Sequence, residues 1–348
     1  FIIPVLIGTF LGTITGLTPG LHINLVSVLI LSSSPFLLKF ASPETLFIVI
    51  ICMALTHIFL DFIPSTFLGV PSEETATTIF PSHELVIQGE GVKAIILPII
   101  GCILSFLFCL ICVPFLIILF PYISDFLKGK VGTFLLFIIL FIMYLEHQRD
   151  ALKESLMIFG LAGVLGYFVL NSKISEPLFP LLSGLFGVSM IIPSIKSKSR
   201  IPPQRKLRKE LIFDLLKETK GKYILISSFA GGLTGFLPGI GASQASIIGS
   251  IITKEYERDS YLLMQGGINT VNFFISLITF YTIAKPRNGA LVVGQKLVRS
   301  ISSDFLLTCL IALVTTAIIA TILAILISAK ISAMMAKIDY ILLMKIIL

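Results

Sequence analysis

Four charged residues lie at two interruptions of an otherwise apolar chain. The first interruption carries two carboxylates and the second carries two cations: Glu73 and Glu74, then Lys285 and Arg287. A charge inside a membrane span costs roughly 2.5 to 3.5 kcal/mol on insertion scales, so those that remain usually face a cavity and a partner. We expect the interruptions to meet, their charges to pair, and a carboxylate ligand to compete for the cations. In the alternative interpretation, all four mark the ends of spans and lie in water.

A histidine and an aspartate form a second candidate group. His57 and Asp61 are four residues apart, on one helical face, near the end of a long apolar run. They could relay a proton or hold a coupling cation; alternatively, Asp61 only marks the end of the run and His57 bonds a backbone carbonyl. The corresponding segment of the second half has Asn269 and Asn272, with Asn272 aligned to His57, and these amides suit contacts with substrate or Na⁺.

Two Pro-Gly pairs are each followed by small or polar residues. In the first half these residues are Pro19, Gly20, His22, Asn24 and Ser27, and in the second half Pro238, Gly239, Gly241, Ser243, Gln244 and Ser246. Proline removes a backbone donor and glycine permits a left-handed turn, so one helix should end and another begin. The new N-terminus favours an anion, and we predict that these residues line a substrate site. Polar packing between spans is the competing explanation.

The Pro-Gly pairs belong to an internal repeat. Residues 12–20 (GTITGLTPG) align with residues 231–239 (GGLTGFLPG), and a further break follows in each half, at Pro71 and at Pro286. Paired breaks in corresponding segments are typical of transporters built from repeats, whose binding site lies where the repeats meet.

The elements that carry these residues are predicted to be membrane-spanning helices. Hydrophobic residues make up 56% of the 348 positions and charged residues 13%, and uncharged runs near the length of roughly 20 residues that a helix needs to cross a bilayer recur along the chain. The runs are 1–38, 45–60, 94–124, 131–145, 155–172, 177–195, 223–253, 260–284 and 305–329. They are too continuously apolar for barrel strands. We expect an all-α polytopic membrane protein with discontinuous helices and about nine to eleven crossings, because the longest runs can hold two passes or two half-helices.

A basic segment separates the halves. Residues 196–222 contain ten basic and three acidic side chains, a surplus equal to the net charge of the whole chain, +7. The positive-inside rule predicts that this linker is cytoplasmic in a multi-pass protein of the plasma membrane. Binding of anionic lipid or nucleic acid by the linker is the minor alternative, and no nucleic-acid partner is expected. The predicted organisation is a first transmembrane repeat with extra spans at 1–195, the linker at 196–222 and a second repeat, expected to be inverted, at 223–348.

At these residues the chain resembles the TctA family, the large membrane subunit of tripartite tricarboxylate transporters. That family carries a glycine-rich segment ending in L-P-G-x-G in each half. Residues 235–241 (GFLPGIG) fit closely, whereas residues 16–22 (GLTPGLH) end in histidine; residues 70–78 and 88–94 resemble further motifs loosely. The anchors span nearly the whole chain. The chain is shorter than is usual for the family, and its four break charges stand where the family has mostly small, uncharged residues.

The resemblance implies uptake of a carboxylate driven by an ion gradient, with a small membrane subunit and an extracytoplasmic solute-binding protein as partners. We expect a secondary active transporter, surrounded by membrane lipid, that moves a small organic anion such as a di- or tricarboxylate by alternating access with Na⁺ or H⁺. No other cofactor, no metal site and no catalytic residue is expected.

Two other classes of protein compete with a transporter as interpretations of the sequence. An embedded enzyme of the undecaprenyl-diphosphate phosphatase type has faintly similar repeats, but Gly235 and Gly241 stand where that chemistry needs Glu, Ser, His or Arg. A passive channel or an assembly subunit is the third class. A channel would equilibrate a solute without accumulating it.

Overall fold

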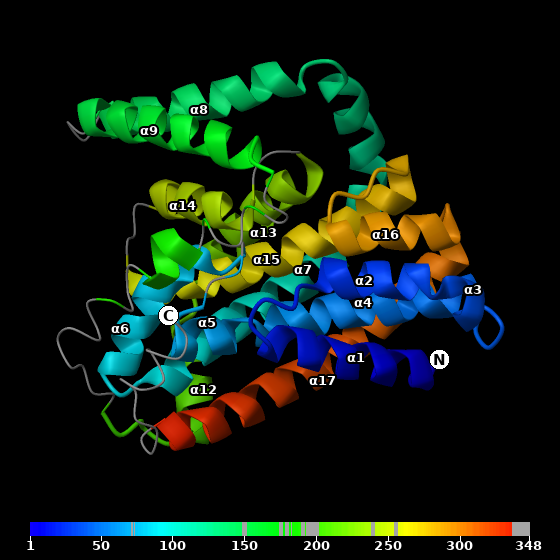
Figure 1. Cartoon of the computed structure of the whole chain (residues 1–348), viewed down its shortest axis with the longest axis horizontal. Coiled ribbons are helices and arrows are strands. Elements are labelled where there is room, and N and C mark those ends of the chain that lie inside the picture. The colour runs from blue at the N-terminus through cyan, green and yellow to red at the C-terminus, as the bar shows by residue number, and fades with distance from the viewer. Residues whose placement is uncertain are drawn as a thin grey trace.

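The computed structural model describes residues 1–70, 72, 74–147, 152–173, 177, 181, 183–188, 192, 202–237, 241–253 and 257–335. In these ranges the chain forms helices and no strand (Figure 1). Five helical segments are long and apolar enough to cross a membrane: Pro43–Leu68, Gly91–Leu127, Leu152–Leu170, Arg258–Ile283 and Ser303–Met335. The predicted all-α polytopic fold is therefore confirmed. The predicted run at 177–195 lies largely outside the described residues.

Along the chain the helices form three groups: those of the first half, those of the region that joins the halves, and those of the second half. The first group is α1 (Ile2–Leu17), α2 (Ile23–Ser32), α3 (Ser34–Leu37), α4 (Pro43–Leu60), α5 (Phe62–Leu68), η1 (Ala76–Thr78), α6 (Ile79–Ile87) and α7 (Gly91–Leu127). The joining region holds α8 (Val131–His147), α9 (Leu152–Leu170), η2 (Ser183–Val188) and α12 (Lys209–Glu218). The last group is α13 (Gly221–Phe236), α14 (Ala242–Thr253), α15 (Arg258–Ile283), α16 (Gly289–Val298) and α17 (Ser303–Met335).

The long apolar run at the start of each half is divided into two half-helices. In the first, α1 ends at Leu17, Gly20 adopts a left-handed φ of 80°, and α2 begins at Ile23. In the second, α13 ends at Phe236 and α14 begins at Ala242. Pro238 and Gly239 lie outside the described residues, but the interruption that they were expected to cause is present around them.

The two later breaks are present as well. Helix α5 ends at Leu68 and is followed by Gly69 with φ 64°, and α15 ends at Ile283 and is followed by Ala284 with φ 52°. A positive φ in a non-glycine residue is uncommon and stops the helical hydrogen-bond ladder. Pro71 lies outside the described residues, whereas Pro286 is buried between α15 and α16.

Small residues at every fourth position let α1 lie against α4 and α13 against α15. A Cβ added at Gly12 would be 2.5 Å from the Met53 carbonyl oxygen, and one at Gly231 would be 2.7 Å from the Ile268 carbonyl oxygen. Such close backbone approach is the usual role of small residues between membrane helices. The contacts of the two halves therefore correspond position by position.

The same correspondence extends to the candidate site. A Cβ at Gly16 would be 3.1 Å from the His57 carbonyl oxygen, and one at Gly235 would be 2.7 Å from the Asn272 carbonyl oxygen. The alignment of Asn272 with His57 made from the sequence thus agrees with how the two helix pairs pack.

The helices gather into two bundles, each with members from both halves. The α4 bundle consists of α4 packed on α1, α2, α16 and α17, and the α15 bundle consists of α15 packed on α6, α7, α13 and α14 (Figure 1). Within the α15 bundle, α7 and α15 cross at Gly101 and Gly266, where an added Cβ at Gly266 would lie 1.9 Å from the Pro98 carbonyl oxygen. Neither half of the chain therefore folds as a separate body.

The linker docks on the turn between α6 and α7. Gln204 accepts a hydrogen bond from the Gly91 N–H (2.9 Å) and donates to the Val86 carbonyl (2.9 Å), while Arg205 pairs with Glu90. Residues 196–201 of the predicted linker lie outside the described residues. The described part of the basic segment is thus attached to the N-terminal end of α7.

Candidate functional site

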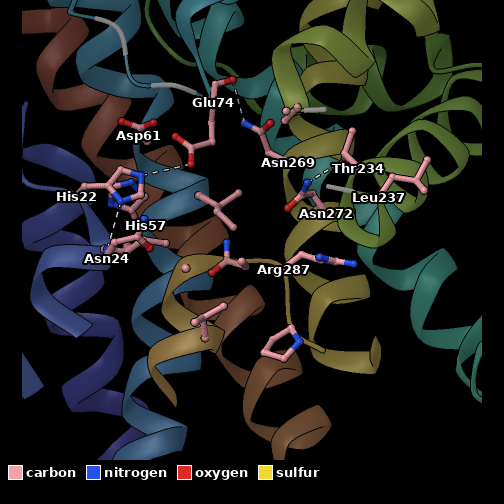
Figure 2. A pocket seen from close by; sticks show the side chains of 18 residues that line it. His22, Asn24, His57, Asp61, Glu74, Thr234, Leu237, Asn269, Asn272 and Arg287 are labelled. Carbon is pink, nitrogen blue, oxygen red and sulfur yellow. Dashed lines mark hydrogen bonds and ion pairs between the residues drawn. The ribbon is translucent and has the colours of Figure 1, made fainter. Parts of the chain in front are cut away.

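All four breaks border one cavity of about 590 Å³, called the chamber below (Figure 2). The predicted site residues that line it are His22, Asn24, His57, Asp61, Glu74, Gly241, Asn269, Asn272 and Arg287. They come from segments up to 265 positions apart in sequence, from His22 to Arg287. The convergence expected from the paired breaks is therefore present in the described part of the chain.

Three helix N-termini open into the chamber. The first residues of α2, α14 and α16 all belong to its wall, namely Ile23, Ala242 and Gly289. A helix N-terminus acts as about half a positive charge and offers N–H groups without partners in the helix. Arg287 adds a full positive charge to the same chamber. Together these groups favour a ligand with more than one negative charge.

Side chains fix where two of these helices begin. The His22 Nδ1 accepts a hydrogen bond from the Asn24 N–H (3.2 Å) at the start of α2, and the Asn288 Oδ1 accepts one from the Ala290 N–H (3.0 Å) at the start of α16. The N–H groups of Arg287 and Asn288 both donate to the Ser276 hydroxyl (2.7 Å each). The break before α16 is therefore anchored to the middle of α15.

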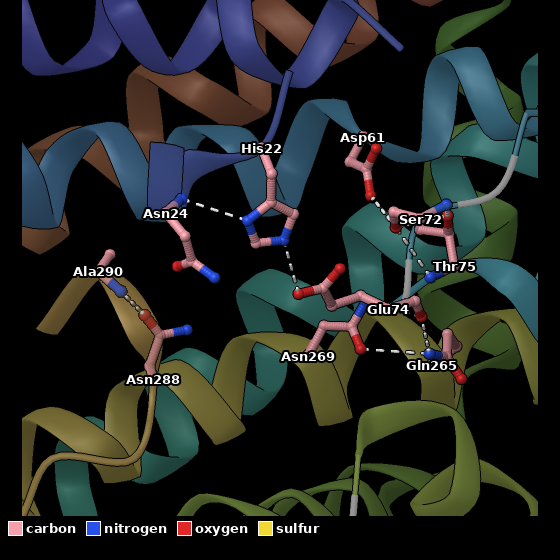
Figure 3. Close-up of polar contacts among 10 residues, drawn as sticks. All are labelled: His22, Asn24, Asp61, Ser72, Glu74, Thr75, Gln265, Asn269, Asn288 and Ala290. Carbon is pink, nitrogen blue, oxygen red and sulfur yellow. Dashed lines mark hydrogen bonds and ion pairs between the residues drawn. The ribbon is translucent and has the colours of Figure 1, made fainter. Parts of the chain in front are cut away.

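The wall from the first half carries carboxylates and imidazoles (Figures 2 and 3). The His22 Nε2 lies 3.3 Å from the Glu74 Oε1, and the His57 ring meets the His22 ring edge-on with centroids 5.6 Å apart. The Ser72 hydroxyl donates to the Asp61 Oδ2 (2.6 Å). Asp61 joins α4 to α5 within the span Pro43–Leu68, so it does not merely mark the end of that span.

The wall from the second half carries amides. The Gln265 Nε2 donates to the Glu74 carbonyl and to the Asn269 Oδ1 (3.2 Å), and the Asn272 Nδ2 donates to the Thr234 hydroxyl (2.8 Å). Gln265, Thr234 and Asn288 were not predicted as site residues. A signal for Gln265 was available, since it stands four residues before Asn269 and thus on the same face of an apolar helix.

Several predicted residues do not line the chamber. Pro19 and Gly20 form the exposed turn before α2, Ser27 is fully buried inside α2, and Gln244 is exposed on α14. Ser246 donates to the Gln265 Oε1 behind the wall. Helical geometry explains the positions of Ser27 and Ser246, because each is the fifth residue of its half-helix and only the first turn reaches the break. Glu73 and the side chain of Ser243 lie outside the described residues.

The cations of the second half separate into two locations. Lys285 lines a neighbouring cavity of about 250 Å³ near the C-terminal end of α7, whereas Arg287 lines both this cavity and the chamber. Glu74 pairs with His22, and no ion pair joins it to Lys285 or Arg287 in the described structure. The expected pairing across the breaks is not found for Glu74, because His22 occupies its carboxylate and the Arg287 side chain extends toward Leu237 (Figure 2).

The comparisons with known proteins agree with this architecture. The chain matches the family described as "Tripartite tricarboxylate transporter TctA family" over residues 2–348. The protein named "Uncharacterized protein MJ1079" of Methanocaldococcus jannaschii is 30% identical over 338 residues, which cover 96% of this chain and 82% of that protein. No solved structure matches the chain. The chain therefore belongs to the TctA family of tripartite tricarboxylate transporters and is a component of a membrane transporter.

Proposed function

We propose that this chain is the subunit that carries the substrate: it moves a small organic anion, a di- or tricarboxylate, by alternating access together with Na⁺ or H⁺. The observation that carries the proposal is the convergence of three helix N-termini and Arg287 on one chamber. Its volume of about 590 Å³ falls within the range of roughly 300 to 1,000 Å³ typical of small-molecule sites.

The two walls of the chamber would bind different ions. A ligand's carboxylates would lie against the N-termini of α14 and α16 and the Arg287 guanidinium, with the Asn272 amide as a further donor. The opposite wall holds Asp61 and Glu74, whose charges would repel that ligand. A cation bound at this wall would remove the repulsion, which is the physical basis of coupling between the two ions.

Two inverted repeats would supply the two walls. The matched glycine contacts of α1 with α4 and of α13 with α15 support a repeat. In Figure 1, α4 runs toward α5 and α15 runs toward α16 in opposite directions across the molecule, which supports inversion. Inverted repeats allow the same site to open to either side of a membrane.

The proposed orientation of the chain in the membrane follows from the two ends of α7. Helix α7 has 37 residues, or about 55 Å at 1.5 Å per residue, enough to pass through a bilayer. The basic linker docks at its N-terminal end, so the positive-inside rule places that end in the cytoplasm of a plasma-membrane protein. Its C-terminal end, beside Lys285, would then face the solute-binding protein, and a small membrane subunit would complete the transporter.

The test is accumulation of labelled citrate and succinate by liposomes that contain the purified chain, under an imposed Na⁺ or proton gradient. Binding of the same anions to the chain in nanodiscs is measured in parallel, with singly charged gluconate as the control. Accumulation above equilibrium in a gradient, with weaker binding of gluconate, is expected. Equilibration without accumulation would indicate a channel, and absence of binding for both polyvalent anions would refute the proposed substrate class.

A further inference from the structure

We propose that the coupling ion is a proton and that the Glu74 carboxylate, beside His22 and His57, receives it. This inference rests on the proposed function, since it identifies the ion that accompanies the anion. It concerns the first-half wall of the chamber, where a glutamate and two histidines lie in contact from one to the next.

Both the side chain and the backbone oxygen of Glu74 make polar contacts. Its carboxylate Oε1 faces the His22 Nε2 at 3.3 Å, and its backbone oxygen accepts hydrogen bonds from Gln265 and, at 3.5 Å, from Asn269. The first contact joins Glu74 to the start of α2, and the others join it to α15. The charge state of this carboxylate therefore acts on a point where the α4 bundle and the α15 bundle meet.

The hydrogen bonds of His22 assign its tautomer. Since the Nδ1 accepts from the Asn24 N–H, the ring proton belongs on Nε2, from which it donates to Glu74. A second ring proton would have to enter at Nδ1 and would remove the cap of α2. An incoming proton is therefore better accommodated on the Glu74 carboxylate, where it removes one negative charge and leaves His22 neutral.

His57 provides the second, independent sign of a proton site. Its side chain belongs to the chamber wall, the residue is only 5% exposed, and neither ring nitrogen has a partner of full hydrogen-bond geometry in the described structure, although the Thr15 backbone is near. A buried polar ring without such partners lowers the stability of the fold, so its presence indicates a functional role. Its contact with the His22 ring places it one step from Glu74.

Hydrogen-bond donors at this wall occupy oxygen lone pairs that a bound Na⁺ would need. A sodium ion needs several oxygen lone pairs directed at it, but the N–H of His22 points at a Glu74 oxygen and the hydroxyl of Ser72 points at an Asp61 oxygen. Both hydrogens are partially positive, so they would repel a Na⁺ ion bound at these carboxylate oxygens.

The other charges of the chamber make the proton and the anion bind cooperatively. Among the described residues, the titratable and charged groups that border it are His22, His57, Asp61 and Glu74 from the first half and Arg287 from the second. With both carboxylates ionised, the wall opposite Arg287 opposes an anion. A proton on Glu74 removes half of that repulsion, so anion binding must in turn strengthen proton binding.

The test counts protons when succinate, fully ionised, binds to the intact chain in nanodiscs. Calorimetry in two buffers of different ionisation enthalpy is carried out from about pH 6.5 to about pH 8.5, with and without Na⁺. Uptake of one proton per anion and an affinity that falls about tenfold per pH unit are expected. Sodium at constant pH is expected to leave the affinity unchanged.

Two substitutions separate Glu74 from other carboxylates. Glu74→Gln imitates the protonated side chain, so it is expected to bind succinate without proton uptake and with an affinity that no longer depends on pH. Glu44→Gln removes an exposed carboxylate at the start of α4 and is the matched control, expected to behave as the wild type. A purely structural role for Glu74 would weaken binding at every pH.

Four results would overturn the inference. If succinate binds with no proton uptake, or if Na⁺ strengthens its binding in place of protons, the coupling ion is wrong while the proposed function stands. If Glu74→Gln retains proton uptake, the site is elsewhere. If neither succinate nor citrate binds to the wild type, the proposed function fails and this inference fails with it. The wild-type measurements decide the ion even if the Glu74 variant does not fold.

Discussion

Arg287 and Lys285 offer the sharpest test of the chamber, because they are two residues apart and similar in charge but differ in place. Arg287 lines the chamber, whereas Lys285 lines only the neighbouring cavity. Replacing each with glutamine removes one charge from the same break. We expect Arg287→Gln to weaken dicarboxylate binding and Lys285→Gln to leave it nearly unchanged.

The size of the effect follows from the contact that is lost. A hydrogen bond between charged groups contributes about 1.5 to 3 kcal/mol, and since about 1.4 kcal/mol is tenfold in affinity, the loss is roughly 10- to 100-fold. Arg287 is exposed to the chamber, and water screens such a pair, so the lower end of that range is expected. The backbone bonds of Arg287 and Asn288 to Ser276 remain in the variant and keep the break in place.

The measurement is calorimetric binding of succinate to each variant in nanodiscs at constant pH. Increasing salt should weaken binding to the wild type more steeply than binding to Arg287→Gln, because the variant has one cation fewer to screen. Equal losses in the two variants would show that only the overall charge of the break matters. An affinity of Arg287→Gln within about threefold of wild type would refute the assignment of Arg287 to the anion.

Two glycine substitutions give further predictions. Gly266→Ala places a Cβ 1.9 Å from the Pro98 carbonyl oxygen. Because the backbone there cannot move aside cheaply, we expect the free energy of unfolding to fall by about 3 kcal/mol and the melting temperature to fall by roughly 5 to 10 °C. Labelling of the buried cysteines during heating measures the melting temperature, and the control Gly160→Ala, whose added Cβ has nothing within 4 Å, should melt as the wild type does. Gly289→Ala places a Cβ 2.4 Å from the Asn24 Oδ1, so the amide must leave the chamber wall and succinate affinity should fall about three- to tenfold with little change in melting; unchanged affinity would contradict a role for this amide.

The spans and breaks could be predicted because their causes are local. Hydrophobic length decides which segments enter a bilayer, and a Pro-Gly pair ends a helix through its own backbone chemistry. The half-helices α6 and α16 were not among the predicted apolar runs, because they are short and contain polar residues such as Glu84 and Gln295. Their helical state depends on packing inside the bundles, which periodicity does not report.

The membership of the site was harder to predict than its existence. Repeat alignment indicated that Asn272 and His57 take matching places, and the packing on Gly235 and Gly16 agrees. The partner of Glu74 was not predicted correctly, because opposite charge alone suggested Lys285 or Arg287. Which break faces which depends on how the bundles exchange helices, and that arrangement leaves no mark in local composition.

The exchange of helices between bundles bears on any movement of one bundle against the other. Among the described helices, the chain passes from the α4 bundle to the α15 bundle through α5 and residues 69–75, and returns through residues 284–288. Glu74 lies in the first crossing and Arg287 in the second. The two hinges that would bend during such a movement are therefore the same strips of backbone that present charge to a ligand, so a bound ion would act on the joints themselves with no relay through intervening helices.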